Sequence, residues 1–220
     1  MRVEPHIKIL QAYLKEELGN NITVDGLIGP ETRATLRRFL YRQFERRGWT
    51  LEHVRNNPTE LVWFRYDKSY NNTFNDYCIV MSYGDVSHVL RATTTPGNYW
   101  IYNPVTVGGI TGVATLCEQQ VIGSHRWVEN NNWKTLWLGM PYAQQVGELT
   151  IFRDGNKDNV FDRNVVKKAK NTGINFHQMG AGTVNWNWSA GCMGTSKEDW
   201  LIIVNRFDNS NMLNLNLLER

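Results

Sequence analysis

The chain has 220 residues, of which 41% are hydrophobic and 12% aromatic, and its formal net charge is +3. This length holds one large domain, or a medium domain with a small one, and the composition is that of a globular protein with a buried core. The near-balanced charge does not indicate a nucleic-acid-binding protein. No run of about 18 apolar residues occurs, so no stable insertion into a membrane is expected.

The first residues form an amphipathic segment, MRVEPHIKILQAYLKEELG, which is interrupted by charges. Its apolar residues recur at the three-and-four spacing of one helix face, and Gly19 suits the end of that helix. The segment lacks the unbroken apolar stretch of a signal peptide. We therefore expect synthesis in the cytoplasm without a signal peptide. The apolar helix positions are Ile7, Leu10, Leu14 and Leu18.

A second helix is predicted after the turn Asp25-Gly26. Pro30 suits the first position of a helix, and Glu31 complements the positive end of the helix dipole. The predicted buried face of this helix consists of Leu36, Phe39 and Leu40.

The pattern LQxxL followed by VDGxIGPETxxxLxxF, within residues 10–39, resembles the three-helix peptidoglycan-binding module that accompanies many wall hydrolases. The resemblance covers roughly residues 3–45 and implies binding to peptidoglycan without chemistry. We accordingly predict a small all-α peptidoglycan-binding domain over residues 1–48. A polar connector over 49–65 and a second domain over 66–220 complete the predicted α+β organisation.

The second domain is predicted to be mainly β with a late helix. The runs 77–83 and 86–93 form a predicted hairpin around Gly84-Asp85, and 148–153 alternates like a strand. Residues 94–101 are expected to form a turn into another strand. Ser196 and Asp199 resemble a capping box that begins the late helix.

The three cysteines, Cys78, Cys117 and Cys192, are too widely spaced for a disulfide framework, and none has zinc-ligand spacing. Cys78 and Cys117 lie in apolar runs and are interpreted as buried residues. Cys192 differs because it follows the small residues Ser189-Ala190-Gly191. It is either a structural thiol in a tight turn or a nucleophile.

A cysteine nucleophile attacks as a thiolate and needs a base, which is usually histidine. His177 lies fifteen residues before Cys192 (192 − 177), so a return of the chain can bring the two together. Gly191 lets the backbone approach a substrate closely, and the amides of Gly191 and Cys192 are candidate oxyanion donors. Ser189 is a candidate hydrogen-bonding partner near the pair.

The run GINFH…SAGC resembles the motif of L,D-transpeptidases, in which a catalytic histidine precedes [S/T]-H-G-C. The run 95–101, TPGNYWI, is similar to the T-P-x-G-x-[FY]-x-I turn of that family. The resemblance spans roughly residues 75–205 and is closest to phage and prophage lysins. It departs at Ala190, which replaces the motif histidine, and at Met193 and Gly194, which replace the polar residues that follow the cysteine.

The resemblance implies acyl transfer on an amide of a peptidoglycan stem peptide, through a Cys192 thioester and with His177 as base. It implies no metal and no organic cofactor. We expect a monomeric endolysin that acts on the cell wall after holin-dependent release and cleaves rather than cross-links. Two alternatives stay open: a true L,D-transpeptidase that cross-links stems or exchanges D-amino acids, and a non-catalytic wall-binding or virion structural protein.

Substrate contacts are predicted from two further segments. Arg126 is a candidate for the missing carboxylate-binding arginine, with His125 lining the cleft, although a surface or packing pair is the alternative. Asn187 and Trp188 flank the cysteine turn and either form a groove wall or pack.

Residues 154–162 place oxygen-bearing side chains at alternate positions, as a calcium loop does. Lys157 lies inside the run, Asn159 stands where a calcium loop has glycine, and no glutamate closes it. A polar turn is therefore the favoured interpretation.

Overall fold

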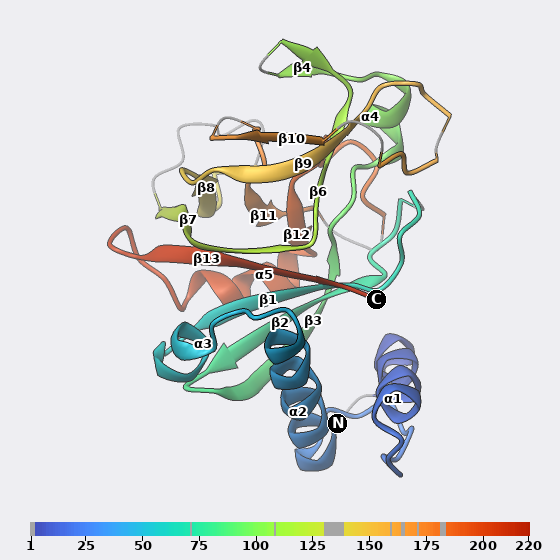
Figure 1. The fold of residues 1–220 in the computed structure, drawn as a ribbon, viewed down its shortest axis with the longest axis vertical. Coiled ribbons are helices and arrows are strands. Elements are labelled where there is room, and N and C mark those ends of the chain that lie inside the picture. The colour runs from blue at the N-terminus through green and yellow to red at the C-terminus, as the bar shows by residue number, and fades with distance from the viewer. Residues whose placement is uncertain are drawn as a thin grey trace. The chain divides into compact units, whose positions relative to one another are not determined.

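The computed structural model describes residues 3–70, 72–107, 109–129, 139–158, 160–163, 166–170, 172–180 and 184–220. It divides into two compact units, one of residues 1–60 with 79–89 and one of residues 61–78 with 90–220 (Figure 1). Helices dominate the first unit and strands the second, which confirms a mixed α+β chain with a mostly β part.

The first unit contains the two predicted helices. Helix α1 ends at Gly19, whose φ of 60° is left-handed, and α2 begins at Pro30, as the sequence predicts. The apolar faces of both helices are buried, which explains why these segments fold as helices. The helices of this unit are α1 (Pro5–Leu18), α2 (Pro30–Arg46) and α3 (Glu52–Asn56).

Gln11 gives the LQ…VDG pattern its physical basis. Its side chain is fully buried, and its Nε2 donates to Asp25 Oδ1 at 2.8 Å, to Leu27 O at 3.0 Å and to Thr32 Oγ1 at 2.9 Å. Its Oε1 accepts from the Gly26 amide at 2.7 Å. The pattern therefore closes the turn between α1 and α2 and satisfies a buried amide.

The segment expected to be a polar connector, residues 49–65, holds helix α3 and strand β1 (Glu60–Arg65). Every residue of β1 is buried because four consecutive apolar side chains, 61–64, follow Pro58. Within the first unit, Gly84 at the tip of the β2–β3 hairpin donates to Val54 O at 2.9 Å. This part of the chain is thus regular structure.

A closed barrel forms the centre of the second unit, with strand order β1-β13-β7-β8-β11-β12-β3-β2. Strand β13 runs parallel to β1 and antiparallel to β7 (Figure 1). The barrel strands after β1 are β2 (Asp76–Ser82), β3 (Asp85–Thr93), β7 (Gln119–Val128), β8 (Tyr142–Gln145), β11 (Phe176–Gln178), β12 (Met193–Thr195) and β13 (Met212–Glu219).

A three-stranded sheet of order β10-β9-β6 and the ribbon β4-β5 complete the strands of this unit. The late helix α5 (Lys197–Val204) is capped by Ser196, whose Oγ accepts from the Asp199 amide at 3.2 Å, as predicted. The remaining strands are β4 (Thr106–Val107), β5 (Ile110–Thr111), β6 (Val113–Leu116), β9 (Leu149–Asp154) and β10 (Val166–Ala169).

The strand expected near residue 101 is instead a short helix, α4 (Asn98–Tyr102). One helical turn buries Ile101 in a cluster with Tyr70 and Val113, while Tyr99 and Tyr102 stay exposed. This tertiary contact overrides the turn-then-strand pattern of the sequence.

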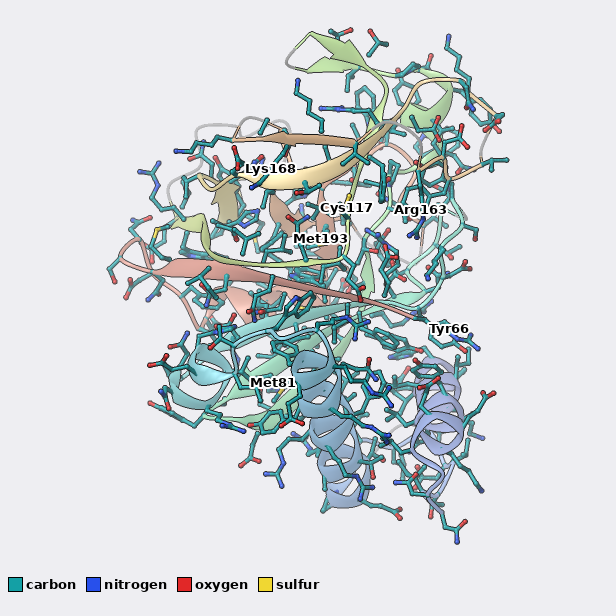
Figure 2. All side chains as sticks on the ribbon, viewed as in Figure 1. Tyr66, Met81, Cys117, Arg163, Lys168 and Met193 are labelled. Atoms are coloured by element: carbon teal, nitrogen blue, oxygen red, sulfur yellow. The ribbon has the colours of Figure 1, made fainter. Side chains whose placement is uncertain are left out.

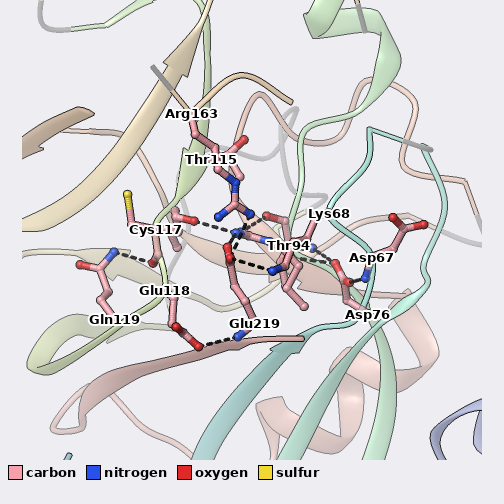
Figure 3. A network of polar contacts seen from close by, with 12 residues as sticks. Asp67, Lys68, Asp76, Thr94, Thr115, Cys117, Glu118, Gln119, Arg163 and Glu219 are labelled. Carbon is pink, nitrogen blue, oxygen red and sulfur yellow. Dashed lines mark hydrogen bonds and ion pairs between the residues drawn. The ribbon is translucent and has the colours of Figure 1, made fainter. Parts of the chain in front are cut away.

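A buried polar network ties β1 to β13 (Figure 3). Arg65, which is fully buried, forms an ion pair with Glu219 and donates from Nη1 to Leu116 O at 2.8 Å. Its Nε donates at 2.8 Å to Thr94 Oγ1, and that hydroxyl donates at 2.7 Å to Asp76. Burial raises the pKa of the Asp76 carboxyl, and the Arg65 charge opposes that rise.

The sequence also predicts no insertion into a membrane and a polar turn over residues 154–162. No helix among the described residues is long and apolar enough to span a bilayer. Residues 154–158 form successive side-chain-closed turns, with Asn156 N bonded to Asp154 and Asp158 N bonded to Asn156. Asn159 lies outside the described residues.

Candidate active site

The turn before β12 holds Cys192 by means of Ser189. The Ser189 Oγ accepts from the Gly191 amide at 2.9 Å and donates to Cys192 O at 2.7 Å. Gly191 has a φ of 148°, and a Cβ there would lie 2.3 Å from Ala114 O, so only glycine fits. Met193, which follows Cys192 and is labelled in Figure 2, is fully buried. The turn is therefore rigidly defined.

These contacts correct two expected roles. The Gly191 amide is engaged by Ser189 and is not directed at a substrate oxyanion in this arrangement. The Ser189 hydroxyl closes the turn through backbone groups and does not bond to the thiol or to the histidine. Ser189 is thus a positioning residue for Cys192.

Cys192 is half-buried, and its sulfur lies against the segment that leads into β11. Its Sγ accepts from the Asn175 amide at 3.3 Å and donates to Gly173 O at 3.3 Å. Burial raises the pKa of the thiol to about 11, and the Asn175 amide opposes that rise. The resting cysteine is a neutral, hydrogen-bonded thiol at neutral pH.

His177 lies on β11, which pairs in parallel with β12 and places His177 opposite Gly194. His177 is two residues beyond Asn175, and Cys192 directly precedes β12, so the predicted base and nucleophile come from two adjacent segments. The His177 Nδ1 donates to Gln178 O at 2.6 Å, which leaves Nε2 as the basic nitrogen of the neutral ring. Burial lowers the pKa of His177 to about 4.

Gln145, which the sequence did not single out, organises the segment that contacts the sulfur. Its Oε1 accepts from Thr172 Oγ1 at 2.7 Å and from the Gly173 amide at 3.1 Å. The backbone amide of Gln145 donates to Asn175 Oδ1 at 2.9 Å. One side chain and its backbone thus hold both residues that bond to Cys192.

His125 does not line a cleft, which corrects the expectation for it. It is fully buried, its ring stacks on Phe176 at a centroid distance of 3.7 Å, and its Nε2 donates to Ile174 O at 3.1 Å. The Ser124 hydroxyl lies 2.7 Å from its Nδ1. Burial lowers the pKa of His125 to about 3. His125 therefore supports the 172–175 segment from inside the barrel.

Arg126 follows on the opposite face of β7, because neighbouring strand residues point to opposite sides. Its side chain is exposed and donates from Nη2 to Gln144 Oε1 at 3.2 Å. The structure thus separates Arg126 from His125, and Arg126 contacts β8.

Asn187 and Trp188 lie directly before the cysteine turn. Asn187 is exposed, and its carbonyl accepts from Trp100 Nε1 at 2.7 Å. Trp188 is half-buried and packs over Gly180, where a Cβ would lie 2.5 Å from the indole ring. Asn187 therefore borders the site, while Trp188 mainly packs.

Arg153 on β9 is a second residue that sequence reasoning missed. It is 4% exposed and donates to Gly112 O at 2.9 Å and Thr172 O at 3.2 Å. Its buried Nε has no hydrogen-bond partner, and no carboxylate pairs with it among the described residues. The alternating pattern of 148–153 was the available signal, since it predicts that every second residue faces inward. Arg153 braces the segment that contacts Cys192.

Comparisons with known proteins give limited information. No protein-family model matches the chain, and no curated protein matches it. An L,D-transpeptidase from Xylanimonas cellulosilytica (residues 123–326) is 15% identical, covers 98% of this chain and 94% of its own, and has a TM-score of 0.37. The catalytic domain of an E. faecium L,D-transpeptidase acylated by ertapenem is 10% identical. The match covers 72% of this chain and 97% of that domain, with a TM-score of 0.26. The chain is thus similar to two L,D-transpeptidase domains, at low sequence identity and low TM-score.

Proposed function

We propose that this chain is a cysteine-dependent acyl transferase of peptidoglycan, of the L,D-transpeptidase type, with Cys192 as nucleophile and His177 as base. One observation carries the proposal: Cys192 is half-buried, and its thiol is held between Asn175 N and Gly173 O, in the segment that continues into His177. A thiol bonded to the segment that continues into a buried neutral imidazole has the elements of nucleophilic catalysis.

The proposed reaction starts from two neutral groups. As the Cys192 sulfur attacks a stem-peptide carbonyl, its proton passes to Nε2 of His177. The C–N bond then breaks, the imidazolium returns the proton to the leaving amine, and a thioester remains until water or an amine resolves it. The Cys192 amide, which lies beside its own sulfur, is the remaining oxyanion donor of the two predicted.

Hydrolysis is the favoured outcome for the thioester, in the setting of a phage-type endolysin. The support is the absence from the sequence of the polar residues that follow the cysteine in the family, where Met193 and Gly194 stand, because synthesis requires a well-held acceptor amine. The predicted peptidoglycan-binding role of residues 1–48 belongs to the same proposal.

The test is digestion of purified sacculi by the wild type and by Cys192→Ala, with soluble products identified by mass spectrometry. Release or shortening of stem peptides by the wild type alone supports the proposal, and the product masses identify the bond. Adding an amine acceptor separates hydrolysis from transfer, because only transfer yields acceptor-linked products.

A second candidate is a wall-binding or virion protein without catalysis. The neutral resting state of both groups favours it, since burial raises the pKa of Cys192 and lowers the pKa of His177. Intact sacculi that pellet with both wild type and Cys192→Ala would support this candidate and contradict the enzymatic one.

A further inference from the structure

Four aromatic side chains form a surface that we name the aromatic ledge. Tyr99 is 40% exposed, Tyr102 51% and Trp186 55%, and Trp100 is half-buried. The Tyr99 ring lies 5.0 Å from that of Trp100 and 6.4 Å from that of Trp186, between centroids. Large aromatic rings exposed together are uncommon on a surface that binds nothing. The ledge consists of Tyr99, Trp100, Tyr102 and Trp186.

The backbone at Trp186 is strained. Its φ is 37°, a left-handed conformation that is an outlier for a bulky L-residue. The surrounding chain enforces it, because Trp186 O accepts from the Tyr99 amide at 3.3 Å and a Cβ on Gly97 would lie 1.9 Å from that carbonyl. The strained residue nevertheless leaves 55% of its surface in solvent, so core packing alone does not explain the conformation.

The ledge is attached to the cysteine turn. The Gly97 amide, directly before α4, donates to Ser189 O at 2.8 Å, and Trp100 Nε1 donates to Asn187 O at 2.7 Å. Ser189 in turn bonds to Cys192 O. Only the short segment 187–192 therefore separates a polymer that lies on the ledge from the candidate nucleophile.

The two segments that supply this surface carry no formal charge. Residues 92–117 and 171–196, which supply the ledge and the cysteine turn, contain no Asp, Glu, Lys or Arg. The polar side chains beside the rings include Asn187, which is exposed, and Asn103, whose Nδ2 donates to Tyr99 O at 2.9 Å and whose Oδ1 can accept. Flat rings bordered by amides suit an uncharged, hydroxyl-rich ring rather than a charged peptide or an anionic lipid.

We propose that the aromatic ledge binds the sugar rings of a glycan strand by stacking. The proposal deepens the proposed function by adding a saccharide contact beside Cys192, and its role on the wall rests on that function. Trp186 and Tyr99 provide the stacking faces, and Asn187 and Asn103 lie where hydrogen bonds to hydroxyl or acetamido groups can form.

The test uses a peptide-free oligomer of N-acetylglucosamine as the probe, titrated against the Cys192→Ala protein so that catalysis plays no part. The readout is the set of indole N–H resonances, in which the Trp186 signal is assigned by its loss in Trp186→Gly. Trp49, the tryptophan of residues 1–60, reports separately on any binding by the first unit.

Trp186→Gly removes the ring and relieves the positive φ, so it is expected to fold, while affinity at the ledge falls roughly tenfold or more. Trp186→Tyr keeps a ring and is expected to retain affinity within about threefold. Tyr83→Gly is the matched control, because Tyr83 is also 67% exposed at a φ of 46° but lies outside the ledge.

Failure of the Trp100 and Trp186 resonances to shift with the probe overturns the proposal, as does equal affinity of Trp186→Gly and Tyr83→Gly. Either result leaves the Cys192 chemistry to be decided by sacculus digestion. Conversely, saccharide binding that depends on Trp186 stands even where Cys192→Ala and wild type treat sacculi alike.

Discussion

The Asn175 amide, which directly precedes β11 and lies 17 residues before Cys192, donates to the Cys192 sulfur across 3.3 Å. The sulfur's environment is therefore set by the backbone of another segment, and the turn around Cys192 supplies only half of it. Substitutions in the 172–175 segment should therefore change the reactivity of the thiol even where the turn around Cys192 is unchanged.

The reactivity of Cys192 is expected to be low at neutral pH in the absence of substrate. Burial raises the pKa of the thiol to about 11, so the thiolate is scarce below that pH. Alkylation by iodoacetamide at pH ~7.5 should be on the order of 100-fold slower than in the unfolded chain, and should rise with pH. Mass spectrometry of the Cys192 peptide, with and without urea, measures both rates. A fast rate that levels off below pH ~7 would show a thiolate–imidazolium pair instead.

Gln145→Leu is expected to reduce Cys192-dependent turnover by about 10²-fold in kcat, with little change in KM, because it frees the segment that holds the sulfur. The same variant should speed alkylation of Cys192. Gln144→Leu is the matched control, since Gln144 is the neighbouring residue, is equally half-buried and accepts only from the exposed Arg126. Equal turnover of the two variants would contradict the positioning role of Gln145.

His125 is expected to make the protein acid-sensitive. Burial lowers its folded-state pKa to about 3, so between its unfolded value and that pH only the unfolded chain takes up the proton. Its stabilising contribution is complete above pH ~6.5 and is lost as the pH falls, by about 1.4 kcal/mol per pH unit. His125→Gln should remove about one proton from the slope of unfolding free energy against pH between ~6 and ~4.5.

Urea unfolding of both proteins across that range measures the two slopes. Comparing slopes rather than absolute stabilities removes the cost of the substitution itself and the opposing contribution of Asp76, which both proteins share. Parallel curves for wild type and His125→Gln would show that His125 is already protonated in the folded state.

Arg65→Met is expected to lower the unfolding free energy by about 3 to 5 kcal/mol, because it leaves Glu219 and Asp76 without their buried cation. Lys68→Met removes a cation from the same glutamate, but Lys68 is 47% exposed and lies 3.9 Å from it, so a change within about 0.5 kcal/mol is expected. Chemical denaturation of the two variants provides the comparison. Similar losses in both would mean that the network acts through total charge rather than through burial.

The sequence was most informative where the deciding interaction is local. Pro30 begins α2, Gly19 ends α1 and Ser196 caps α5, because each of these residues acts on backbone groups within one turn of itself. The coarse mixed α+β organisation follows from the same local signals together with the alternating strand patterns.

The sequence was least informative where long-range pairing decides. His125 and Arg126 were expected to act together, but the pairing of β7 with β8 and β13 buries one and exposes the other. Neither Gln145 nor Arg153 lies in a recognisable motif, and their hydrogen-bond partners, Gly112 and residues 172–175, lie in segments distant in the sequence. Ile101 illustrates the same limit, since its burial against Tyr70 and Val113 turns a predicted strand into α4.

Strand β13 also bears on how the protein is made. It lies between β1 and β7 in the barrel, so Trp63 cannot reach its register partner Leu217 until the ribosome has delivered nearly all of the residues printed here. Helices α1 and α2 can form during translation, whereas barrel closure is a late event that joins distant parts of the chain. The barrel that frames the cysteine turn is therefore completed only after β13 has been synthesised, and a chain that stops before β13 has an unassembled site.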